Sequence, residues 1–443
     1  MPYESSSWTA VRREAGKALG LVRHGALTAV TTTSVTIPSL YLNTNRAGSQ
    51  LDGEIIISRP DATSAADNKR YAGAVTTSSG LVTVAGGANY ADTTFTSEVG
   101  EEWKHNFDPY VEGLDEANEA LKFVPVGTYY MLTSGGIPDL NYDCQESAAT
   151  DFTDIGTPTK SVVTTVRRVR YGRRSVRVLS SGADEGIYTA TLPVTMEKAA
   201  KAFALVSSDV AGAAIGLYDV TNSLLVGSAV TTNEEAMMLV ALPWQTPETA
   251  TCKEVAIRAL GTTTTADNYY NGFAIHEQGN LYFDFPSAIS ERFKAPSIFQ
   301  MVPQGSSSTA NVYPASSIEQ VELVEGEDFK YRFHHIDANA YGIVLLKESL
   351  LEWPLMVEAQ IPAADFGTFS TEASTTVAPF NQVVPTVALR WLDKIILPRL
   401  GANEHWVGIR GIIKADLDDA KKVRAPRPMA TRRDWGGPHG RRI

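Results

Sequence analysis

Residues 167–178 read RRVRYGRRSVRV, and this stretch decides the fold expected for a large central part of the chain. Val169 and Tyr171 alternate with arginines before Gly172, and Val176 and Val178 flank an arginine after it. A period of two places alternate side chains on opposite faces of a strand, and glycine permits a tight turn between strands. The stretch therefore predicts two strands joined by a turn at Gly172.

Similar short apolar runs, bounded by turn residues, continue along the chain as far as residue 289. They cover residues 186–192, 202–206, 214–220, 237–242, 254–260 and 271–276. About eight short strands at regular spacing are typical of a two-sheet jelly roll. We therefore predict that residues 161–289 form a jelly-roll β-sandwich that folds autonomously.

The order of short motifs in this block resembles that of the galactose-binding-like jelly rolls of carbohydrate-binding modules. The motifs are Gly-x-x-Ser-Val-x-Val from Gly172, Gly-x-Tyr from Gly186, Leu-Tyr-Asp from Leu217 and Asp-x-x-Tyr from Asp267. The resemblance implies the fold more than it implies sugar binding, because many such domains in virion and surface proteins have no known ligand.

Aromatic and polar residues near the loops of this block form a candidate glycan-binding site. Trp244, Tyr269 and Tyr270 supply rings on which a sugar can stack, and Asp267 supplies a carboxylate that accepts hydrogen bonds. The alternative is that Trp244 and Phe273 fill the sandwich core while the two tyrosines pack at its rim. The sequence leaves both interpretations open.

Residues 8–24 carry an amphipathic helical pattern. Its apolar positions are Trp8, Val11, Ala15, Ala18, Leu19 and Val22. This spacing predicts a helix that ends near Gly25, and we assign residues 1–25 as an N-terminal helical arm. The helix either packs on its own domain or docks on a neighbouring subunit. For the second case the candidate docking residues are Trp8, Arg12 and Arg13.

The remaining ordered chain is expected to form two further domains. Residues 26–160 predict a β-rich domain, a small barrel or sandwich with a short helix at 108–121. Residues 290–423 predict an α+β domain that ends in helices at 384–397 and 407–422. The fold class is therefore mainly β and multidomain, with helices at both ends.

Residues 424–443 are basic and rich in proline and glycine. Their arginines include Arg424, Arg427, Arg432, Arg433, Arg441 and Arg442. Such a segment has too few apolar residues for a core, so we expect an arm that docks on a partner protein. The formal net charge of −11 argues against a general nucleic-acid binder and lets identical acidic neighbours attract the arm. Phosphates of DNA are the competing partner.

No common catalytic, cofactor or metal motif is present in the sequence. His334 and His335 are adjacent in an expected strand, so their side chains point to opposite faces, a poor metal geometry. The adjacent acid pairs are expected to be solvated; they are Glu101-Glu102, Asp184-Glu185, Glu234-Glu235 and Asp418-Asp419. We therefore predict a non-enzymatic protein with no cofactor and no metal.

The two cysteines and the hydropathy pattern bear on the compartment. Cys144 and Cys252 are far apart in sequence and predict buried free thiols, with a disulfide as the open alternative. No apolar run approaches the ~20 residues that a membrane span needs. The N-terminus lacks the basic and apolar regions of a signal peptide.

The pattern Trp8-x-x-Val11-Arg12-Arg13-x-x-Gly16-x-x-Leu19-Gly20-Leu21 precedes small β domains and a basic tail. This arrangement resembles structural proteins of tailed bacteriophages, especially the neck or head–tail adaptor proteins that join portal to tail. The resemblance implies a virion component, assembled in the host cytoplasm as a homo-oligomeric ring. Its expected partners are the portal and other tail or neck proteins, with packaged DNA as a contact of the C-terminal arm and no membrane. The alternative is a glycan- or receptor-binding tail component that acts through the jelly roll.

Overall fold

The structure is a computed structural model of the chain. It describes residues 6–38, 56–58, 69–76, 81–84, 99–105, 107–135, 144, 152–165, 168–172, 174–182, 184–194, 198–209, 212–247, 251–263, 265–285, 289, 296–305, 311–326, 330–335, 341–367, 375–376 and 378–422. The described residues divide into two compact units: the jelly-roll unit, which comprises Gly127–Ile361, and the helical unit, which combines Tyr3–Val126 with Pro362–Ala425. This division differs from the five consecutive ranges predicted from the sequence, because the helical unit is built from segments at both ends of the chain.

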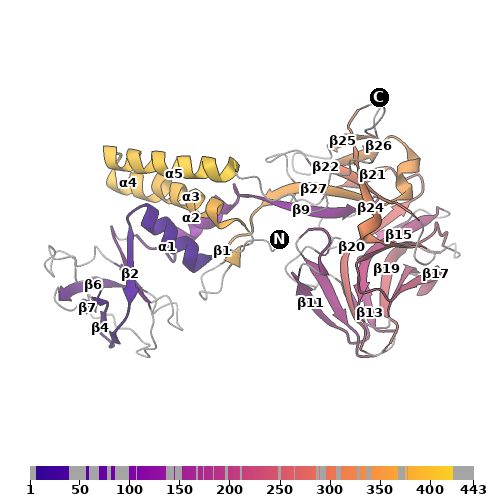
Figure 1. Cartoon of the computed structure of the whole chain (residues 1–443), viewed down its shortest axis with the longest axis horizontal. Helices are drawn as coiled ribbons and strands as arrows, with labels where there is room; N and C mark the ends of the chain where they lie inside the picture. Colours follow the sequence, from indigo (N-terminus) through magenta and orange to yellow (C-terminus); the bar gives the residue numbers. More distant parts are fainter. Residues whose placement is uncertain are drawn as a thin grey trace, which may run out of the picture. The chain divides into compact units, whose positions relative to one another are not determined.

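The jelly roll consists of two antiparallel sheets, as predicted (Figure 1). The β19 sheet has the order β10-β13-β19-β16-β17, with β14 also paired to β19. The bounds are β10 Thr153–Ile155, β13 Gly186–Tyr188, β14 Leu192–Pro193, β16 Ala213–Asp219, β17 Leu224–Thr232 and β19 Glu254–Gly261. The β20 sheet has the order β11-β12-β20-β15-β18-β23. Its bounds are β11 Thr159–Val163, β12 Ser175–Leu179, β15 Ala200–Ser208, β18 Met238–Ala241, β20 Asp267–Glu277 and β23 Val312–Pro314. The sandwich thus extends past 161–289 at both ends, through β10 and β23.

The core of the jelly roll follows from the period-two alternation of its strands. Ile215 and Leu217 of β16 and Ile257 of β19 point inward and are fully buried against Val206 of β15 and Phe273 of β20. Burying one such side chain contributes roughly 1.5–3 kcal/mol. Cys144 and Cys252 belong to the same core and are free thiols, which confirms the prediction made for them.

The first of the two strands predicted in residues 167–178 is not formed. Residues 168–172 are a loop, and only β12 is a strand, paired with β11 on one side and β20 on the other. The buried side chain of Asn271 replaces the strand partner: its Oδ1 accepts from the N–H groups of Arg170 and Tyr171, and its Nδ2 donates to the carbonyls of Tyr171 and Arg174. One side chain therefore satisfies the backbone groups that a ladder would have satisfied.

A second layer covers the outward face of the β20 sheet. It is the sheet β24-β22-β27-β9, with a smaller sheet β21-β26-β25 beside it in the same unit. The bounds are β9 Pro125–Leu132, β21 Tyr282–Asp284, β22 Ser297–Pro303, β24 Ile318–Leu323, β25 Tyr331–His335, β26 Tyr341–Leu345 and β27 Leu355–Pro362. Phe203 and Leu205 of β15 and Leu239 of β18 form one apolar cluster with Met301 of β22 and Met356 of β27. Strands β15 and β18 of the β20 sheet are therefore buried on both faces.

The helical unit contains a seven-stranded sheet and a layer of helices (Figure 1). The sheet order is β2-β8-β5-β6-β7-β4-β3, and β1 pairs separately with β28. The bounds are β1 Ser6–Ser7, β2 Val22–Ala26, β3 Ala29–Val30, β4 Ser34–Thr36, β5 Ile56–Ser58, β6 Lys69–Thr76, β7 Leu81–Val84, β8 Val99–Trp103 and β28 Thr375–Thr376. The helices are α1 Trp8–Ala18, α2 Glu112–Leu121, α3 Phe380–Trp391, a π-helical turn Leu392–Ile396, α4 Leu397–Leu400 and α5 Glu404–Lys422. Among the described residues, no helix is both long enough and apolar enough to span a membrane.

Helix α1 begins and ends for local reasons. The Oγ of Ser7 accepts a hydrogen bond from the N–H of Ala10 at 3.3 Å, which caps the helix. The helix stops before Gly20, whose φ of 64° is a left-handed conformation that glycine adopts without strain. The expected end near Gly25 is wrong, because residues 22–26 form β2 and pair with β8.

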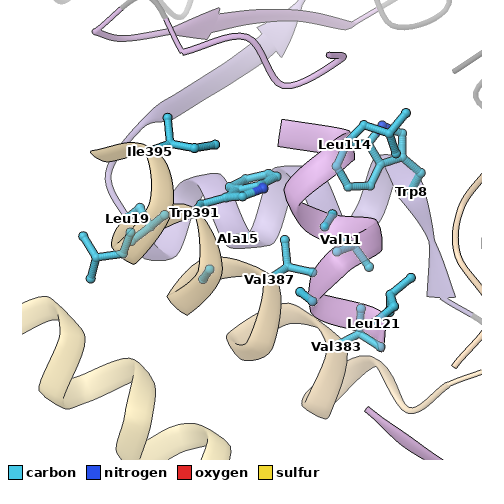
Figure 2. Packing of buried hydrophobic residues seen from close by; sticks show 14 of the residues in the cluster. Trp8, Val11, Ala15, Leu19, Leu114, Leu121, Val383, Val387, Trp391 and Ile395 are labelled. Atoms are coloured by element: carbon cyan, nitrogen blue, oxygen red, sulfur yellow. The ribbon is translucent and has the colours of Figure 1, made fainter. Parts of the chain in front are cut away.

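The apolar face of α1 is buried within its own unit. Trp8, Val11 and Ala15 pack with Val387 and Trp391 of α3 in one cluster, as Figure 2 shows. The rings of Trp8 and Trp391 have centroids 6.1 Å apart and meet edge to face, a favoured aromatic geometry. Of the two alternatives for this helix, packing on its own domain is the one observed.

We predict that an isolated fragment of residues 125–362 unfolds cooperatively and that a fragment of residues 161–289, which the sequence alone suggested would fold autonomously, does not. The shorter fragment lacks β10 and β23 and exposes the outward apolar face of the β20 sheet. Such an exposed face favours aggregation. Circular dichroism and thermal unfolding of both fragments test the prediction, and a cooperative transition of the shorter fragment at the same midpoint would contradict it.

His276 of β20 is a buried titratable group at the contact between the β20 sheet and the second layer. Its side chain is fully buried, and Nδ1 lies 2.8 Å from the carbonyl oxygen of Leu351. Burial lowers the pKa of His276 to about 4, so the neutral ring donates from Nδ1 at pH 7.

We predict that His276 alone reduces the free energy of unfolding by about 2 kcal/mol between pH 7 and pH 5. The unfolded chain protonates this ring near its ordinary pKa of 6.5, whereas the folded ring stays neutral until about pH 4. Stability is therefore complete above pH 6.5 and falls as the pH approaches 4. Urea unfolding of the wild type and His276→Gln at several pH values measures the slope, and equal slopes would rule the assignment out.

Candidate functional site

Trp244, the first residue of the predicted glycan site, is used within the fold. Its Nε1 donates to Glu352 Oε2 at 2.9 Å, and its half-buried ring packs against the apolar cluster of the second layer. The ammonium group of Lys201 lies 5.8 Å from the ring centroid and pairs with the same glutamate. This tryptophan therefore joins the jelly roll to the second layer of its unit, and it does not lie beside the predicted tyrosines.

Tyr269 and Tyr270 do not form one platform. They are consecutive residues of β20, so their side chains point to opposite faces of the sheet. Tyr270 is 0% exposed and belongs to the sandwich core, where burial raises the pKa of its hydroxyl. The expectation that Tyr270 contacts a ligand is thus wrong, because no part of its side chain reaches the surface.

Asp267 and Tyr269 belong to a charge cluster that is satisfied internally. Arg177 Nε and Nη2 donate to the two carboxylate oxygens of Asp267, both at 2.8 Å, and the Tyr269 hydroxyl lies 3.1 Å from Oδ2. Arg168 pairs with Asp209, and its guanidinium lies 4.5 Å from the Tyr269 ring centroid. Two arginines and two carboxylates therefore neutralise one another, which is the arrangement of a structural cluster.

The predicted docking residues at the N-terminus form the interior of the helical unit. Trp8 and Arg12 are 0% exposed, and Arg12 Nη2 lies 2.9 Å from Glu101 Oε1. Arg13 Nε binds the same oxygen at 2.6 Å, and Trp103 Nε1 donates to the other at 2.9 Å. The assignment of Trp8, Arg12 and Arg13 to a docking surface is therefore corrected, because the buried Glu101 holds both arginines.

Glu101 also corrects the expectation of solvated acids. It is 0% exposed and Glu102 is 4% exposed. Burial raises the pKa of Glu101, but the charges of Arg12 and Arg13 and their hydrogen bonds outweigh burial and hold it below its ordinary value. The other predicted docking residues, from Arg424 to Arg442, lie outside the described residues.

The outward face of the β19 sheet presents a different set of side chains. Directly paired residues across the strands bring Thr153 of β10 next to Tyr188 of β13, and Tyr188 next to Arg258 of β19. On β16 the direct partner of Arg258 is Gly216. Tyr218 is two residues further along β16 and lies diagonally beside Arg258. We call Tyr188, Tyr218 and Arg258 the tyrosine–arginine surface.

The two tyrosine rings of this surface lie side by side. Their centroids are 5.0 Å apart with an interplanar angle of 33°, and the Arg258 guanidinium carbon lies 5.1 Å from the Tyr218 centroid. Ala256, the small residue of β19 opposite Tyr218, is fully buried beneath them. The alanine leaves room for rings from two non-adjacent strands to meet over β19.

The edge of the surface is apolar toward β17. A Cβ atom on Gly216 would lie 2.5 Å from Leu225 Cδ1, so the Leu225 side chain lies over this glycine. Tyr188, Tyr218, Leu225 and Arg258 are all half-buried, and Thr153 is exposed. The result is a broad patch that combines ring faces, hydroxyls and one cationic donor group.

The electrostatics of the surface are set by Arg258. Burial and the hydroxyl of Tyr218 raise the pKa of Tyr188, while Arg258 acts in the opposite direction. Glu185, three residues before Tyr188, is held by the hydroxyl and N–H of Ser181 and the N–H of Gly182, which lower its pKa to about 2. Within the part of the chain that the structure describes, none of the ion pairs involves Arg258.

Metal chemistry has no evident location among the described residues, because no group of three or more histidine, cysteine, aspartate or glutamate side chains is arranged to hold an ion. His334 belongs to β25 and stacks edge to face on Tyr282.

Sequence reasoning missed the tyrosine–arginine surface as a site. Tyr188 and Tyr218 entered only as parts of the Gly-x-Tyr and Leu-Tyr-Asp motifs, and Arg258 only as part of an expected strand. The signal that could have found the surface was the period-two alternation of the strands. Tyr188, Tyr218 and Arg258 each follow a residue that faces the core, namely Ile187, Leu217 and Ile257. The alternation places all three side chains on the outward face of their strands, but it does not show that β13, β19 and β16 are neighbours in the sheet.

Comparison with known proteins gives structural likenesses only. No family model matches the sequence, and no curated protein matches it. The CBM22-1 xylan-binding domain from Paenibacillus barcinonensis Xyn10C is 14% identical, with a TM-score of 0.25, covering 31% of this chain and 91% of that domain. The carbohydrate-binding module CBM36, in complex with calcium and xylotriose, is 16% identical, with a TM-score of 0.20, covering 29% and 93%. The enzymatically active domain of Bacteriophage CBA120 tailspike protein 4 is 13% identical, with a TM-score of 0.24, covering 30% and 21%. At these TM-scores the likenesses assign no function.

We predict that Glu101→Gln destabilises the helical unit by about 3–5 kcal/mol at pH 7, because it removes the buried carboxylate that pairs with the fully buried Arg12. The stabilisation by Glu101 is present above its ordinary pKa near 4.5 and is lost as the pH falls through its lower folded pKa. Chemical denaturation of both proteins measures the change.

The matched control is Glu14→Gln. This substitution removes one partner of the exposed Lys17–Glu14 pair on α1, the helix that also carries Arg12. We expect a change below about 0.5 kcal/mol, because exposed pairs contribute little. Equal effects of the two substitutions would show that burial does not set the strength of the Glu101 pair.

Proposed function

We propose that the protein is a non-enzymatic saccharide-binding component and that it binds through the tyrosine–arginine surface. The observation that carries the proposal is the pair of tyrosine rings, 5.0 Å apart, on the outward face of the β19 sheet with an arginine beside them. A sugar ring has one apolar C–H face that stacks on aromatic rings and a rim of hydroxyls that hydrogen-bond to polar groups.

The arrangement of the two sheets supports this choice of face. Outward side chains of the β20 sheet such as Leu205 and Leu239 pack against the second layer, and the outward Arg177 and Tyr269 are engaged with Asp267. The outward side chains of the β19 sheet, by contrast, belong to none of the apolar clusters formed by the described residues. A rigid sheet also holds the rings in place before binding, so little side-chain entropy is lost.

We propose a virion of a tailed phage as the setting, on the N-terminal pattern given above. Two roles were expected there: an adaptor ring that joins portal to tail, and a glycan- or receptor-binding tail component. The surface favours the second role. The first loses one of its supports, since Trp8, Arg12 and Arg13 are occupied inside their own unit. Assembly into a homo-oligomer with portal or tail proteins stays a prediction.

We predict that the full chain binds at least one oligosaccharide and that Tyr188→Ala and Tyr218→Ala each weaken this binding about tenfold, as expected for loss of one stacking ring. A glycan array selects the ligand, isothermal titration calorimetry measures the affinity, and the sugar should be recovered uncleaved. The control is Tyr282→Ala, which removes an exposed tyrosine of β21.

The control should bind as the wild type does. Absence of binding to every glycan tested would reject the proposed function. Binding that neither tyrosine substitution affects would reject the proposed site.

A further inference from the structure

We infer that the saccharide bound by the tyrosine–arginine surface carries a carboxylate, and that Arg258 is the residue that recognises it. The inference rests on the proposed function and adds the chemical class of the ligand. The arginines of the jelly roll differ in whether a carboxylate of the fold pairs with the guanidinium, and this difference is the basis of the inference.

Two other arginines of the sandwich are neutralised by carboxylates within the fold, and a third, Arg170, donates to the carbonyl of Ala315. Arg177 binds both oxygens of Asp267, and Arg168 pairs with Asp209. Arg258 instead has tyrosines as its neighbours: its guanidinium lies over the Tyr218 ring, and it interacts with the hydroxyl of Tyr188. A guanidinium has five N–H donors in a planar fork that matches the two oxygens of a carboxylate. Arg258 therefore retains donor capacity for a bidentate acceptor.

The acidic groups close to Arg258 in sequence or pairing are directed elsewhere. Asp219, next to Tyr218, is 2% exposed and accepts from the backbone and side chain of Asn222. Glu185 is held by Ser181 and Gly182. Glu254 is exposed on the same strand, but four residues at roughly 3.4 Å each separate it from Arg258. The local charge of the surface is thus positive.

The overall charge makes this local feature selective. The chain carries a formal net charge of −11, so its general field repels acidic polymers. Attraction of an acidic sugar then depends on a short-range contact with the guanidinium and not on non-specific binding. Such a contact discriminates well, because a ligand with its carboxyl group removed leaves the arginine fork unsatisfied.

The dimensions allow a short oligosaccharide. Thr153, Tyr188, Arg258 and Tyr218 come from four consecutive strands of the sheet order β10-β13-β19-β16. Neighbouring strands are about 4.8 Å apart, so the row is about 14 Å long. One sugar ring can stack on the tyrosines while its carboxylate reaches Arg258, and the next sugar extends toward Thr153.

The test uses the full-length protein and pairs of probes that differ only in charge. The acidic probes are oligomers of galacturonate, of mannuronate and guluronate, and of unsulfated glucuronate-containing glycosaminoglycan; the partners are the same oligomers with each carboxyl group reduced to a primary alcohol. Calorimetry at fixed ionic strength gives both affinities. We expect at least one acidic probe to bind at least tenfold more tightly than its reduced partner.

The variants separate recognition from general electrostatics. Arg258→Gln should remove the preference for the acidic probe, and Arg258→Lys should keep part of it, because the charge remains and the fork is lost. Tyr218→Ala should weaken the acidic and reduced probes alike. The control is Arg332→Gln, which removes an exposed arginine of β25 and should leave the preference unchanged.

The outcomes separate recognition of a carboxylate by Arg258 from saccharide binding as such. Equal binding of acidic and reduced probes, with no effect of either Arg258 substitution, would overturn the inference and leave the proposed function standing. A preference that Arg332→Gln reduces as much as Arg258→Gln would overturn it in favour of non-specific attraction. Binding of no acidic, reduced or neutral saccharide would overturn both.

Discussion

The packing of the β20 sheet on both of its faces determines where the jelly roll can act. Every residue from Ala200 to Ser208 of β15 is buried, which happens only when a strand has apolar partners above and below it. Phe203 and Leu205 face the second layer, while Ala204 and Val206 face the sandwich core. The outward residues of β15 are therefore not available to a ligand, and Arg177 and Tyr269, which are partly exposed on the same face, are engaged with Asp267. The β19 sheet instead carries half-buried aromatic and charged residues, among them Tyr188, Tyr218 and Arg258, on its outward face.

The arginines of the chain show how a single residue type takes three roles according to its partners. Arg12 is fully buried and requires Glu101, because an unpaired guanidinium away from water is very costly. Arg177 is partly exposed and forms a bidentate pair that fixes the start of β20. Arg258 lies at the surface among tyrosines, where solvent reduces the cost of leaving the charge unpaired. The lack of a carboxylate partner among the described residues, beside two neighbouring rings, is the feature that distinguishes the tyrosine–arginine surface from the charge cluster of Arg177 and Asp267.

Period-two alternation was enough to predict the jelly roll, most of its strands and which residues face inward. The same alternation argues against the predicted glycan site, because consecutive residues of a strand, such as Tyr269 and Tyr270, point to opposite faces of the sheet. The loop at residues 168–172 could not be predicted, because its backbone is satisfied by Asn271, about a hundred positions along the chain. The site was hidden for a similar reason. Tyr188, Tyr218 and Arg258 meet only through a strand order in which sequence neighbours are not sheet neighbours.

The N-terminal helix also shows that a sequence pattern does not identify the residues that a buried face packs against. An amphipathic pattern states that one face is buried but not what covers it, and here the cover comes from α3, more than three hundred residues later. The charged residues are equally uninformative alone, since Arg12 and Arg13 acquire their meaning from Glu101 on β8. The pattern that resembled an adaptor protein therefore describes how the helical unit closes on itself. A docking role for the chain therefore requires surfaces other than this helix face, whereas the proposed role of the tyrosine–arginine surface depends on no residue of the helical unit.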